Sequence, residues 1–232
     1  MQPITLFLLP GLMCDADVWR HQHTHLADLA HIVAPDFRGY DSLPAMAASV
    51  LKTAPERYAV AGHSMGGRVA LELWRLAPDR ISKLALLETG ADPLAPGEAA
   101  RRQALIVLAQ NEGMQALIDF WLPPLLHPDN RGNAELRNAI TAMLKRTSVE
   151  DFIKQMRALI NRPDATACLK QIHCPTLLLA GRHDTLYPVR QLQDMLAEIA
   201  QARLVVLEDA GHMAPMEKPE PVTAALREWL LS

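Results

Sequence analysis

Short apolar runs that alternate with helical segments constrain the fold of this chain more than any other feature. Most of the runs end at a turn signal or a polar residue, and segments with helical spacing lie between them. This alternation predicts an α/β protein with a parallel sheet and helices on both faces. The six runs are Ile4–Leu9, His31–Ala34, Arg57–Ala61, Leu84–Leu87, Thr176–Ala180 and Leu204–Leu207.

The spacing of these runs divides the chain into a core and one insertion. Between the fourth and fifth runs, residues 91–169 have helical patterns throughout, so we expect residues 1–90 and 170–232 to form the core. A helical insertion in a parallel α/β protein is typical of a lid over the active site, which is the role we predict here. Its expected helices are Gly97–Gln110, Met114–Leu122, Ala134–Arg146 and Val149–Ile160, the last one capped by Ser148.

The composition excludes several classes of protein. Half of the residues are apolar, which allows a large core, and the formal net charge is −3 with no basic block. Nucleic acid and anionic membranes are therefore not expected partners, while the oligomeric state is left open. The three cysteines, Cys14, Cys168 and Cys174, lack metal-type spacing and indicate a reduced, cytoplasmic protein. Residues 1–9 lack a basic start and a cleavage site, and no apolar run is long enough to span a bilayer.

The segment Gly62–Gly67, with the sequence Gly-His-Ser-Met-Gly-Gly, places one serine between an expected strand and an expected helix. Small glycines on both sides let the backbone turn sharply enough to expose the hydroxyl of Ser64. Ser64 is therefore the candidate nucleophile, with an ordinary helix-capping serine as the alternative. The helix should end near Ala77, because Pro78 cannot continue it. The side chain of the adjacent His63 should point elsewhere.

A serine hydroxyl is a weak nucleophile at neutral pH, so it needs a base that is oriented by an acid. Asp184 follows the fifth apolar run, and His212 lies in the loop after the sixth. Loops after parallel strands open on the same edge of a sheet, so Ser64, Asp184 and His212 are expected to converge there. Glu88, just beyond the fourth run, is the main rival acid. Asp209 is a weaker rival, because it is too close in sequence to His212 to reach round it.

With these residues, the chain resembles the α/β-hydrolase fold superfamily, in particular serine hydrolases of the carboxylesterase type that carry a helical cap. The order Ser64, Asp184, His212 is the order of the triad in that family. The resemblance covers nearly the whole chain and is specific for the fold but not for the substrate. Its other supporting segments are Leu9-Pro10-Gly11, Asp36-Phe37-Arg38-Gly39, Gly181-Arg182-His183-Asp184 and Gly211-His212 with Glu217-Lys218-Pro219.

The resemblance implies a serine hydrolase that needs no cofactor or metal and cleaves a carboxylic ester or a related acyl compound. It places the oxyanion donors at the backbone N–H of Met65 and at that of Leu12 or Met13. Family members often begin with an antiparallel hairpin, whereas this chain starts directly at the strand before Leu12, so about six parallel strands are expected. Asp41 stands where a second glycine is common in the loop after Gly39.

The substrate pocket is the least predictable part of the site. An insertion rich in leucine and methionine would give the pocket an apolar ceiling, although helical spacing also suits packing within the insertion. The candidate substrate-binding residues are Met13, Trp121, Leu125, Met143 and Met156.

Two other functions remain open on the same fold. C–C bond hydrolases, lyases and perhydrolases use the same three residues, and an Arg68 that faced the pocket would favour an anionic substrate of that kind. Otherwise Arg68 is expected to be a solvated or paired surface arginine. A non-catalytic ligand-binding protein is a third possibility, which the complete set of Ser64, Asp184 and His212 disfavours.

Several other residues have a structural interpretation. His21 and His25 lie one helical turn apart, a spacing that metals use, but nothing nearby completes a site, so an exposed helix face is expected. Cys14 is expected to be a small buried residue. Asp36 and Arg38 are expected to form an ion pair that braces their loop.

Overall fold

The core of the protein is one parallel sheet, seen in a computed structural model that describes residues 3–232. The first two residues of the predicted core, Met1 and Gln2, lie outside the described residues. The strands pair in the order β2-β1-β3-β4-β5-β6, and every neighbouring pair is parallel. The predicted fold class and the predicted six strands are confirmed. The strands are β1 (Ile4–Leu9), β2 (Ala30–Val33), β3 (Tyr58–His63), β4 (Ile81–Leu87), β5 (Thr176–Gly181) and β6 (Ala202–Leu207).

The register of the central strands aligns their carboxyl ends at one edge of the sheet. His63 at the end of β3 pairs with Leu87 at the end of β4, and Gly181 of β5 pairs with Leu207 of β6. Every residue of β3 and β5 is buried, as expected for strands covered on both faces. The loops after β3, β4, β5 and β6 therefore emerge side by side.

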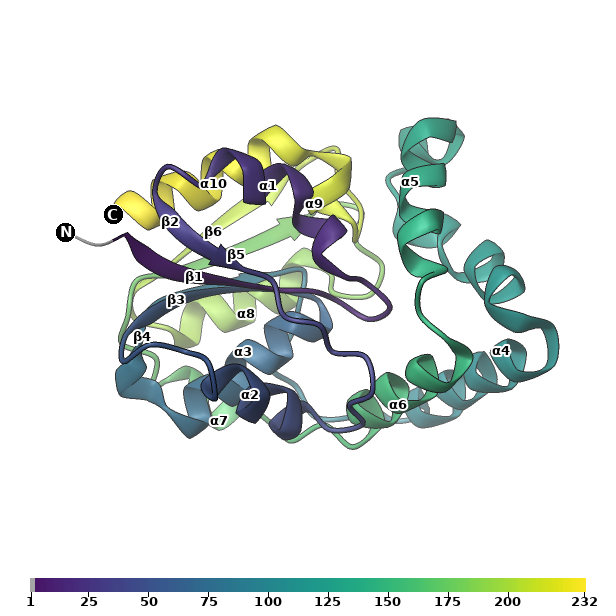
Figure 1. Ribbon diagram of the computed structural model, residues 1–232, viewed down its shortest axis with the longest axis horizontal. Coiled ribbons are helices and arrows are strands. Elements are labelled where there is room, and N and C mark those ends of the chain that lie inside the picture. The colour runs from purple at the N-terminus through teal and green to yellow at the C-terminus, as the bar shows by residue number, and fades with distance from the viewer. Residues whose placement is uncertain (1–2) are drawn as a thin grey trace.

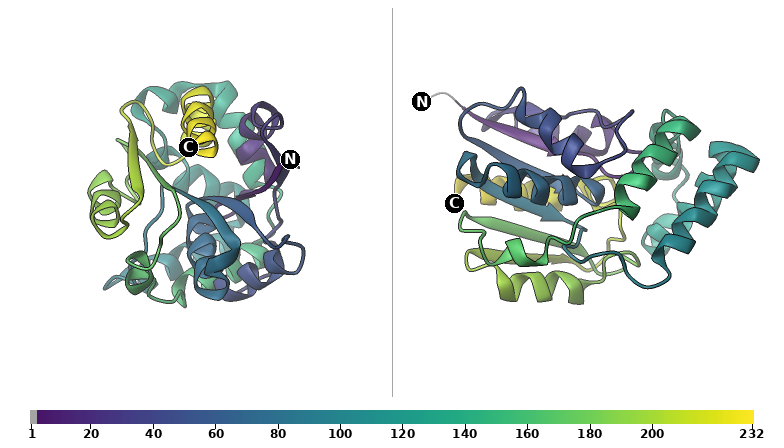
Figure 2. Two further views of the ribbon diagram at one scale, coloured as in Figure 1. Left: turned by 90° about the vertical axis from the view of Figure 1, so that its left-hand side faces the viewer. Right: turned by 90° about the horizontal axis from the view of Figure 1, so that it is seen from below.

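Helices cover both faces of this sheet (Figures 1 and 2). One face carries η1 (Ala16–Trp19), α1 (Arg20–His25), α9 (Ala214–Glu217) and α10 (Pro219–Leu231). The other face carries α2 (Leu43–Leu51), α3 (Met65–Leu76), the short turn η2 (Pro78–Arg80) and α8 (Val189–Glu198). Helix α3 ends before Ala77 and Pro78, as predicted. Within residues 3–232, no helix combines the length and the apolar character that crossing a bilayer requires.

The segment between β4 and β5 is helical, as predicted, and we call residues 91–169 the helical insertion. Gly113 breaks its longest helix, with φ 83° and ψ 175°, where the sequence pattern predicts the gap between two helices. Helices α4, α5 and α6 project beyond the carboxyl edge of the sheet, whereas α7 returns beside α3 (Figures 1 and 2). Its elements are α4 (Glu98–Trp121), η3 (Pro123–Leu125), η4 (Pro128–Gly132), α5 (Ala134–Leu144), α6 (Val149–Ile160) and α7 (Thr166–Leu169).

The two ends of the helical insertion are joined where they meet the core. The Ala165 N–H donates to the Ala91 carbonyl at 3.0 Å. The nearly buried Arg162 donates to the Pro93 carbonyl at 2.9 Å and to both carboxylate oxygens of Glu98, at 2.7 and 2.6 Å. The insertion therefore leaves the core and returns to it through one narrow connection.

Candidate active site

The sharp turn predicted at Ser64 is present between β3 and α3. Ser64 has φ 54° and ψ −117°, which is strained for a residue with a side chain. A Cβ atom on Gly62 would lie 2.3 Å from the Gly66 carbonyl oxygen, and one on Gly66 would lie 2.2 Å from the Leu9 carbonyl oxygen. Only glycine fits at these two positions, because the turn packs directly against its own backbone and against β1.

Ser64, His212 and Asp184 form one hydrogen-bonded chain at the carboxyl edge of the sheet. The Ser64 Oγ lies 2.9 Å from His212 Nε2, and His212 Nδ1 lies 2.8 Å from Asp184 Oδ2. The other carboxylate oxygen, Asp184 Oδ1, accepts the backbone N–H groups of Leu186 at 2.8 Å and Tyr187 at 3.0 Å. All three side chains are buried, and the backbone contacts hold the Asp184 carboxylate in one orientation.

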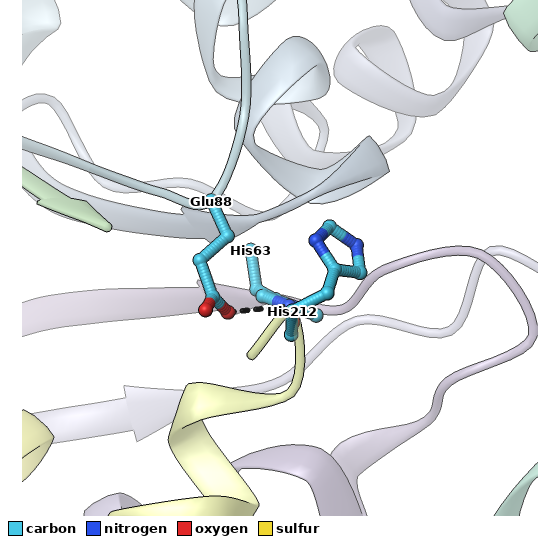
Figure 3. Close-up of side chains that lie close together, drawn as sticks. All are labelled: His63, Glu88 and His212. Carbon is cyan, nitrogen blue, oxygen red and sulfur yellow. Dashed lines mark hydrogen bonds and ion pairs between the residues drawn. The ribbon is translucent and has the colours of Figure 1, made fainter. Parts of the chain in front are cut away.

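Glu88, the predicted rival acid, faces His63 (Figure 3). Its Oε2 is 3.1 Å from His63 Nε2 and accepts the Ala214 N–H at 3.1 Å. The same His63 nitrogen lies 2.7 Å from the His212 carbonyl oxygen, so His63 points away from Ser64, as predicted, and supports the His212 backbone. Burial lowers the pKa of His63 and raises the pKa of Glu88 well above its usual range, which favours the uncharged form of each.

Ligand atoms of His63, Glu88 and His212 lie within 4.8 Å of one another, a spacing that a metal ion could use. However, both ring nitrogens of His212 are already within hydrogen-bond distance of Ser64 and Asp184. A metal at this position would have to break that chain. We therefore interpret the cluster as a hydrogen-bonded support for the His212 loop.

The loop after β1 adopts a tight turn in which Leu12 and Met13, the two alternatives for the second oxyanion donor, have different environments. The Cys14 N–H donates to the Gly11 carbonyl at 3.1 Å, and Met13 inside the turn has a φ of 60°. The Met13 N–H donates to the side-chain oxygen of Gln155 at 2.9 Å. Because Met13 N–H is occupied, Leu12 is the better candidate for the second donor. The first candidate, Met65 N–H, lies at the start of α3.

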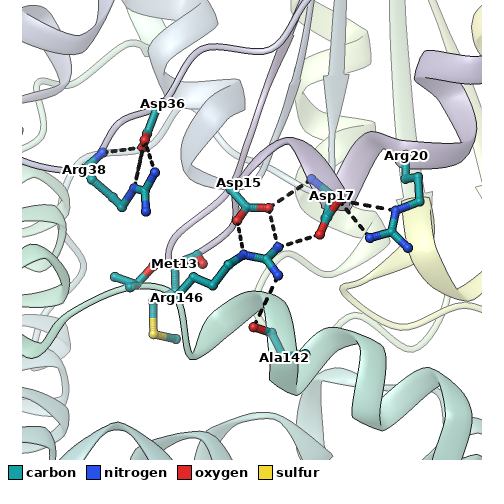
Figure 4. Close-up of polar contacts among 9 residues, drawn as sticks. Met13, Asp15, Asp17, Arg20, Asp36, Arg38, Ala142 and Arg146 are labelled. Atoms are coloured by element: carbon teal, nitrogen blue, oxygen red, sulfur yellow. Dashed lines mark hydrogen bonds and ion pairs between the residues drawn. The ribbon is translucent and has the colours of Figure 1, made fainter.

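The helical insertion holds the loops after β1 and β2 through side chains of α6 and of the turn before it. Arg146 Nε lies 2.6 Å from Asp15 Oδ2 in the loop after β1 (Figure 4). The Thr147 hydroxyl donates to the Met13 carbonyl at 3.1 Å. Asp151 accepts the Gly39 N–H at 2.9 Å in the loop after β2. These contacts cross the boundary between core and insertion, and the sequence contained no local signal for them.

The loop that carries His212 is braced by Glu217, which sequence reasoning did not assign a role. One carboxylate oxygen of Glu217 accepts the N–H groups on either side of His212, from Gly211 at 2.9 Å and Met213 at 3.2 Å. The other oxygen accepts the His127 N–H and the Asn130 side chain of the insertion, both at 2.8 Å. The sequence signal that could have indicated this role of Glu217 is its position in the segment Gly211-His212 to Glu217-Lys218-Pro219, which supports the family resemblance.

The predicted substrate-binding residues are mostly buried. Met13, Leu125, Met143 and Met156 are at most 1% exposed, and Trp121 is half-buried. The Leu125 carbonyl accepts the His212 N–H at 2.6 Å, so this residue directly contacts the loop that carries His212. Their burial suits a pocket lining and packing within the insertion equally. An open cavity of about 500 Å³ lies between η1, α5 and α9, and none of the residues in the Ser64–His212–Asp184 chain lines it.

Arg68 differs from the expectation that it would lie on the surface. Its side chain is 4% exposed. It donates to the Asp92 carbonyl at 2.9 Å and to the Tyr187 hydroxyl at 3.4 Å. These partners hold the guanidinium away from solvent, because a buried cation needs its donors satisfied.

The remaining structural interpretations agree with the structure. Asp36 and Arg38 form an exposed ion pair (Figure 4). Cys14 is buried, and burial raises the pKa of its thiol to about 12, which disfavours a thiolate. The rings of His21 and His25 stack at 4.0 Å on a largely exposed helix. The predicted cap at Ser148 is also present, accepting the Asp151 N–H.

The parallel sheet and the serine at its strained turn define a class of α/β enzymes with hydrolase architecture. Residues 6–225 match the model of the Alpha/beta hydrolase family, and the chain belongs to this family. An esterase from Thermogutta terrifontis is 31% identical, covers 98% of this chain and 89% of its own, and superposes with a TM-score of 0.91. An enol-lactonase from Burkholderia xenovorans LB400 is 26% identical over 100% of this chain and 93% of its own, with a TM-score of 0.86. A pimeloyl-acyl-carrier-protein methyl ester esterase from Aliivibrio salmonicida is 26% identical over 89% of this chain and 84% of that protein.

Proposed function

We propose that this hydrolase cleaves carboxylic esters or related acyl compounds through an acyl-enzyme on Ser64, without a cofactor. The observation that carries the proposal is the unbroken chain of hydrogen bonds from Ser64 Oγ through both ring nitrogens of His212 to Asp184. Serine becomes an effective nucleophile only when a base accepts its proton and an acid orients that base.

The proposed mechanism has two halves. In the first, His212 Nε2 takes the Ser64 proton while Oγ attacks the acyl carbon, and the returned proton leaves with the alcohol. In the second, His212 activates a water molecule that releases the carboxylic acid and restores Ser64. Asp184 holds the Nδ1–H of His212 and stabilises the imidazolium. The backbone N–H groups of Met65 and Leu12 bind the oxyanion, and one such donor contributes about 3–4 kcal/mol.

The similar proteins support this reaction class. The names of the esterase, the enol-lactonase and the methyl ester esterase describe transfer of an acyl group to water. At 26–31% identity they support the class of reaction and leave the acyl group open. We also propose that the helical insertion acts as a lid with an apolar inner face. Cys14, Cys168 and Cys174 are all free and buried, which suits the proposed cytoplasmic location.

C–C bond cleavage, lyase chemistry and perhydrolase chemistry are the second candidate functions. The observation that would favour them is an arginine at position 68 that faces the pocket with a free guanidinium, whereas Arg68 already donates to the Asp92 carbonyl and to the Tyr187 hydroxyl. Strong labelling of Ser64 by a fluorophosphonate together with negligible ester turnover would move the assignment to this second group. A non-catalytic binding protein would show neither.

The test measures turnover of acetyl and butyryl nitrophenyl esters by the wild type, by Ser64→Ala and by Ser49→Ala. Ser49 lies on α2, and its hydroxyl donates to the Met46 carbonyl of the same helix, so its variant should match the wild type. Ser64→Ala should lose at least about 10⁴-fold in kcat, as in other enzymes with this arrangement. Wild-type rates in Ser64→Ala would contradict the mechanism.

A further inference from the structure

Two side chains of the helical insertion form hydrogen bonds with the backbone N–H and the backbone carbonyl of Met13, in the loop after β1. Gln155 Oε1 accepts the Met13 N–H at 2.9 Å, and the Thr147 hydroxyl donates to the Met13 carbonyl at 3.1 Å. Gln155 is 1% exposed and Thr147 is 4% exposed. Both contacts are therefore shielded from water. In such a buried environment a hydrogen bond is stronger, and an unpaired donor or acceptor is more costly.

The orientation of the Gln155 amide is determined by its two neighbours. The Met13 N–H can only donate and the Phe37 carbonyl, 3.4 Å from Gln155 Nε2, can only accept. One orientation of the amide satisfies both, with the oxygen toward Met13. Gln155 thus joins the loop after β1 to the loop after β2.

The residue that Gln155 holds is strained. Met13 has a φ of 60° in the turn that the Cys14 N–H closes onto the Gly11 carbonyl. Positive φ at the third residue is the feature that a type II turn requires, and glycine normally occupies that position. A methionine there would relax by flipping the Leu12–Met13 peptide toward a type I turn. Such strain persists only where surrounding contacts enforce it, and the bond to Gln155 requires the unflipped peptide.

We infer that Gln155 is a positioning residue for the oxyanion hole: it holds the Leu12–Met13 peptide in the strained turn and so fixes the backbone at Leu12, whose own N–H in the preceding peptide is the proposed donor to the acyl oxygen. The inference rests on the proposed function, in which Leu12 and Met65 are the donors. It also assigns the helical insertion a part in transition-state binding, in addition to covering the pocket.

The experiment compares three variants in the full chain. Gln155→Met keeps the length of the side chain but removes its acceptor and donor. Gln155→Glu restores an acceptor for the Met13 N–H. The matched control, Asp151→Ala, lies one helical turn earlier and removes a bond between insertion and core at Gly39, without touching the loop after β1. For each variant we would measure kcat and KM for a butyryl nitrophenyl ester and the Ki of an alkylboronic acid, whose serine adduct places an oxygen in the oxyanion hole.

Gln155→Met should lower kcat and boronate affinity together, approaching the about 10²-fold loss seen when an oxyanion donor is removed, with KM little changed. Gln155→Glu should recover most of both values, and Asp151→Ala should stay within about threefold of the wild type. Unchanged kcat and Ki in Gln155→Met, or an equal loss in Asp151→Ala, would overturn the inference. If Gln155→Met does not fold, Thr147→Val removes the other contact with the same shape and should lower kcat and boronate affinity in parallel.

These outcomes are separate from a failure of the proposed function. If the wild type turns over esters and Ser64→Ala does not, an unchanged Gln155→Met overturns only the role of Gln155. If the wild type shows neither ester turnover nor boronate binding, the proposed function itself fails.

Discussion

The core and the helical insertion contribute to the same site in different ways. The core supplies the side chains of Ser64, His212 and Asp184, from the ends of β3, β6 and β5. The insertion supplies groups that hold backbone segments of the core, namely Gln155 on Met13 and the Leu125 carbonyl on the His212 N–H. The proposed reacting groups therefore all come from the core, whereas the groups that position them come both from the core, as Glu217 does, and from the insertion.

The largest effect that would sharpen this comparison belongs to the core. Asp184→Asn should lower kcat by about 10⁴-fold, because the amide no longer stabilises the imidazolium or selects the His212 tautomer. Glu88→Gln should cost less than about tenfold, since Glu88 contacts His63 and the Ala214 N–H, and not the His212 ring. Ester turnover of the two purified variants checks this. A larger loss in Glu88→Gln would make Glu88 the acid.

The next effect lies where core and insertion meet. Each carboxylate oxygen of Glu217 accepts hydrogen bonds from two N–H groups. In Glu217→Gln, the NH₂ group would replace one of these oxygens and leave its two N–H groups without an acceptor. Leaving buried donors unsatisfied costs about 1–3 kcal/mol, so we expect a loss of about 10- to 100-fold in kcat. The exposed Glu220, on the next helix, provides the control Glu220→Gln. Equal rates of fluorophosphonate labelling in both variants would show that Glu217 does not position His212.

A smaller effect concerns the stability of the insertion alone. Gly113 has φ 83° and ψ 175°, and among the described residues no atom beyond its chain neighbours and its own helix backbone lies within 4 Å of the position of an added Cβ. Gly113→Ala should therefore lower the free energy of unfolding by about 1–3 kcal/mol through backbone strain without a clash. Gly132, equally open but without positive φ, is the matched site, and Gly132→Ala should be neutral or slightly stabilising. Urea unfolding measures both, and equal stabilities would refute the strain at Gly113.

The smallest effect is a pH dependence at the connection between insertion and core. Partial burial acts to raise the pKa of Glu98, but hydrogen bonds from Arg162, the Ala95 N–H and Arg102 outweigh it and lower the pKa from 4.5 to about 2. The depressed pKa stabilises the folded state above pH 4.5, and this contribution disappears as the pH falls toward 2.

The matching measurement compares the wild type with Glu98→Gln at several pH values. The difference in their free energies of unfolding should be constant above about pH 5 and shrink steadily below it. A difference that stays constant through this window would show that the pKa of Glu98 is not depressed in the folded state.

The sequence predicted the core well because its signals are local. The run Ile4–Leu9 coincides with β1, and the other runs match their strands to within a few residues. The convergence of Ser64, Asp184 and His212 follows from a general property of parallel sheets, in which the loops at the carboxyl ends share one edge. Their catalytic roles stay a prediction until the variants are measured.

The remaining features depend on contacts between distant segments. Gln155 lies 142 residues from Met13 along the chain, and nothing in the spacing of α6 distinguishes it from other polar residues. Arg68 reads as a surface residue on an amphipathic helix, yet Tyr187 and the Asp92 carbonyl bury it. Local patterns predict which face of an element is apolar, but not which polar group will meet it across the boundary.

The joined ends of the helical insertion have a consequence for how the chain can change over evolutionary time. Because the hydrogen bond between Ala91 and Ala165 joins the two ends of the insertion, the insertion is equivalent, for the stability of the core, to one long loop with fixed ends. Closing such a loop costs only about 0.6 kcal/mol more for each doubling of its length. Insertions of very different size could therefore be exchanged at this position with little effect on the stability of the sheet. Any replacement would, however, have to supply a new acceptor for the Met13 N–H.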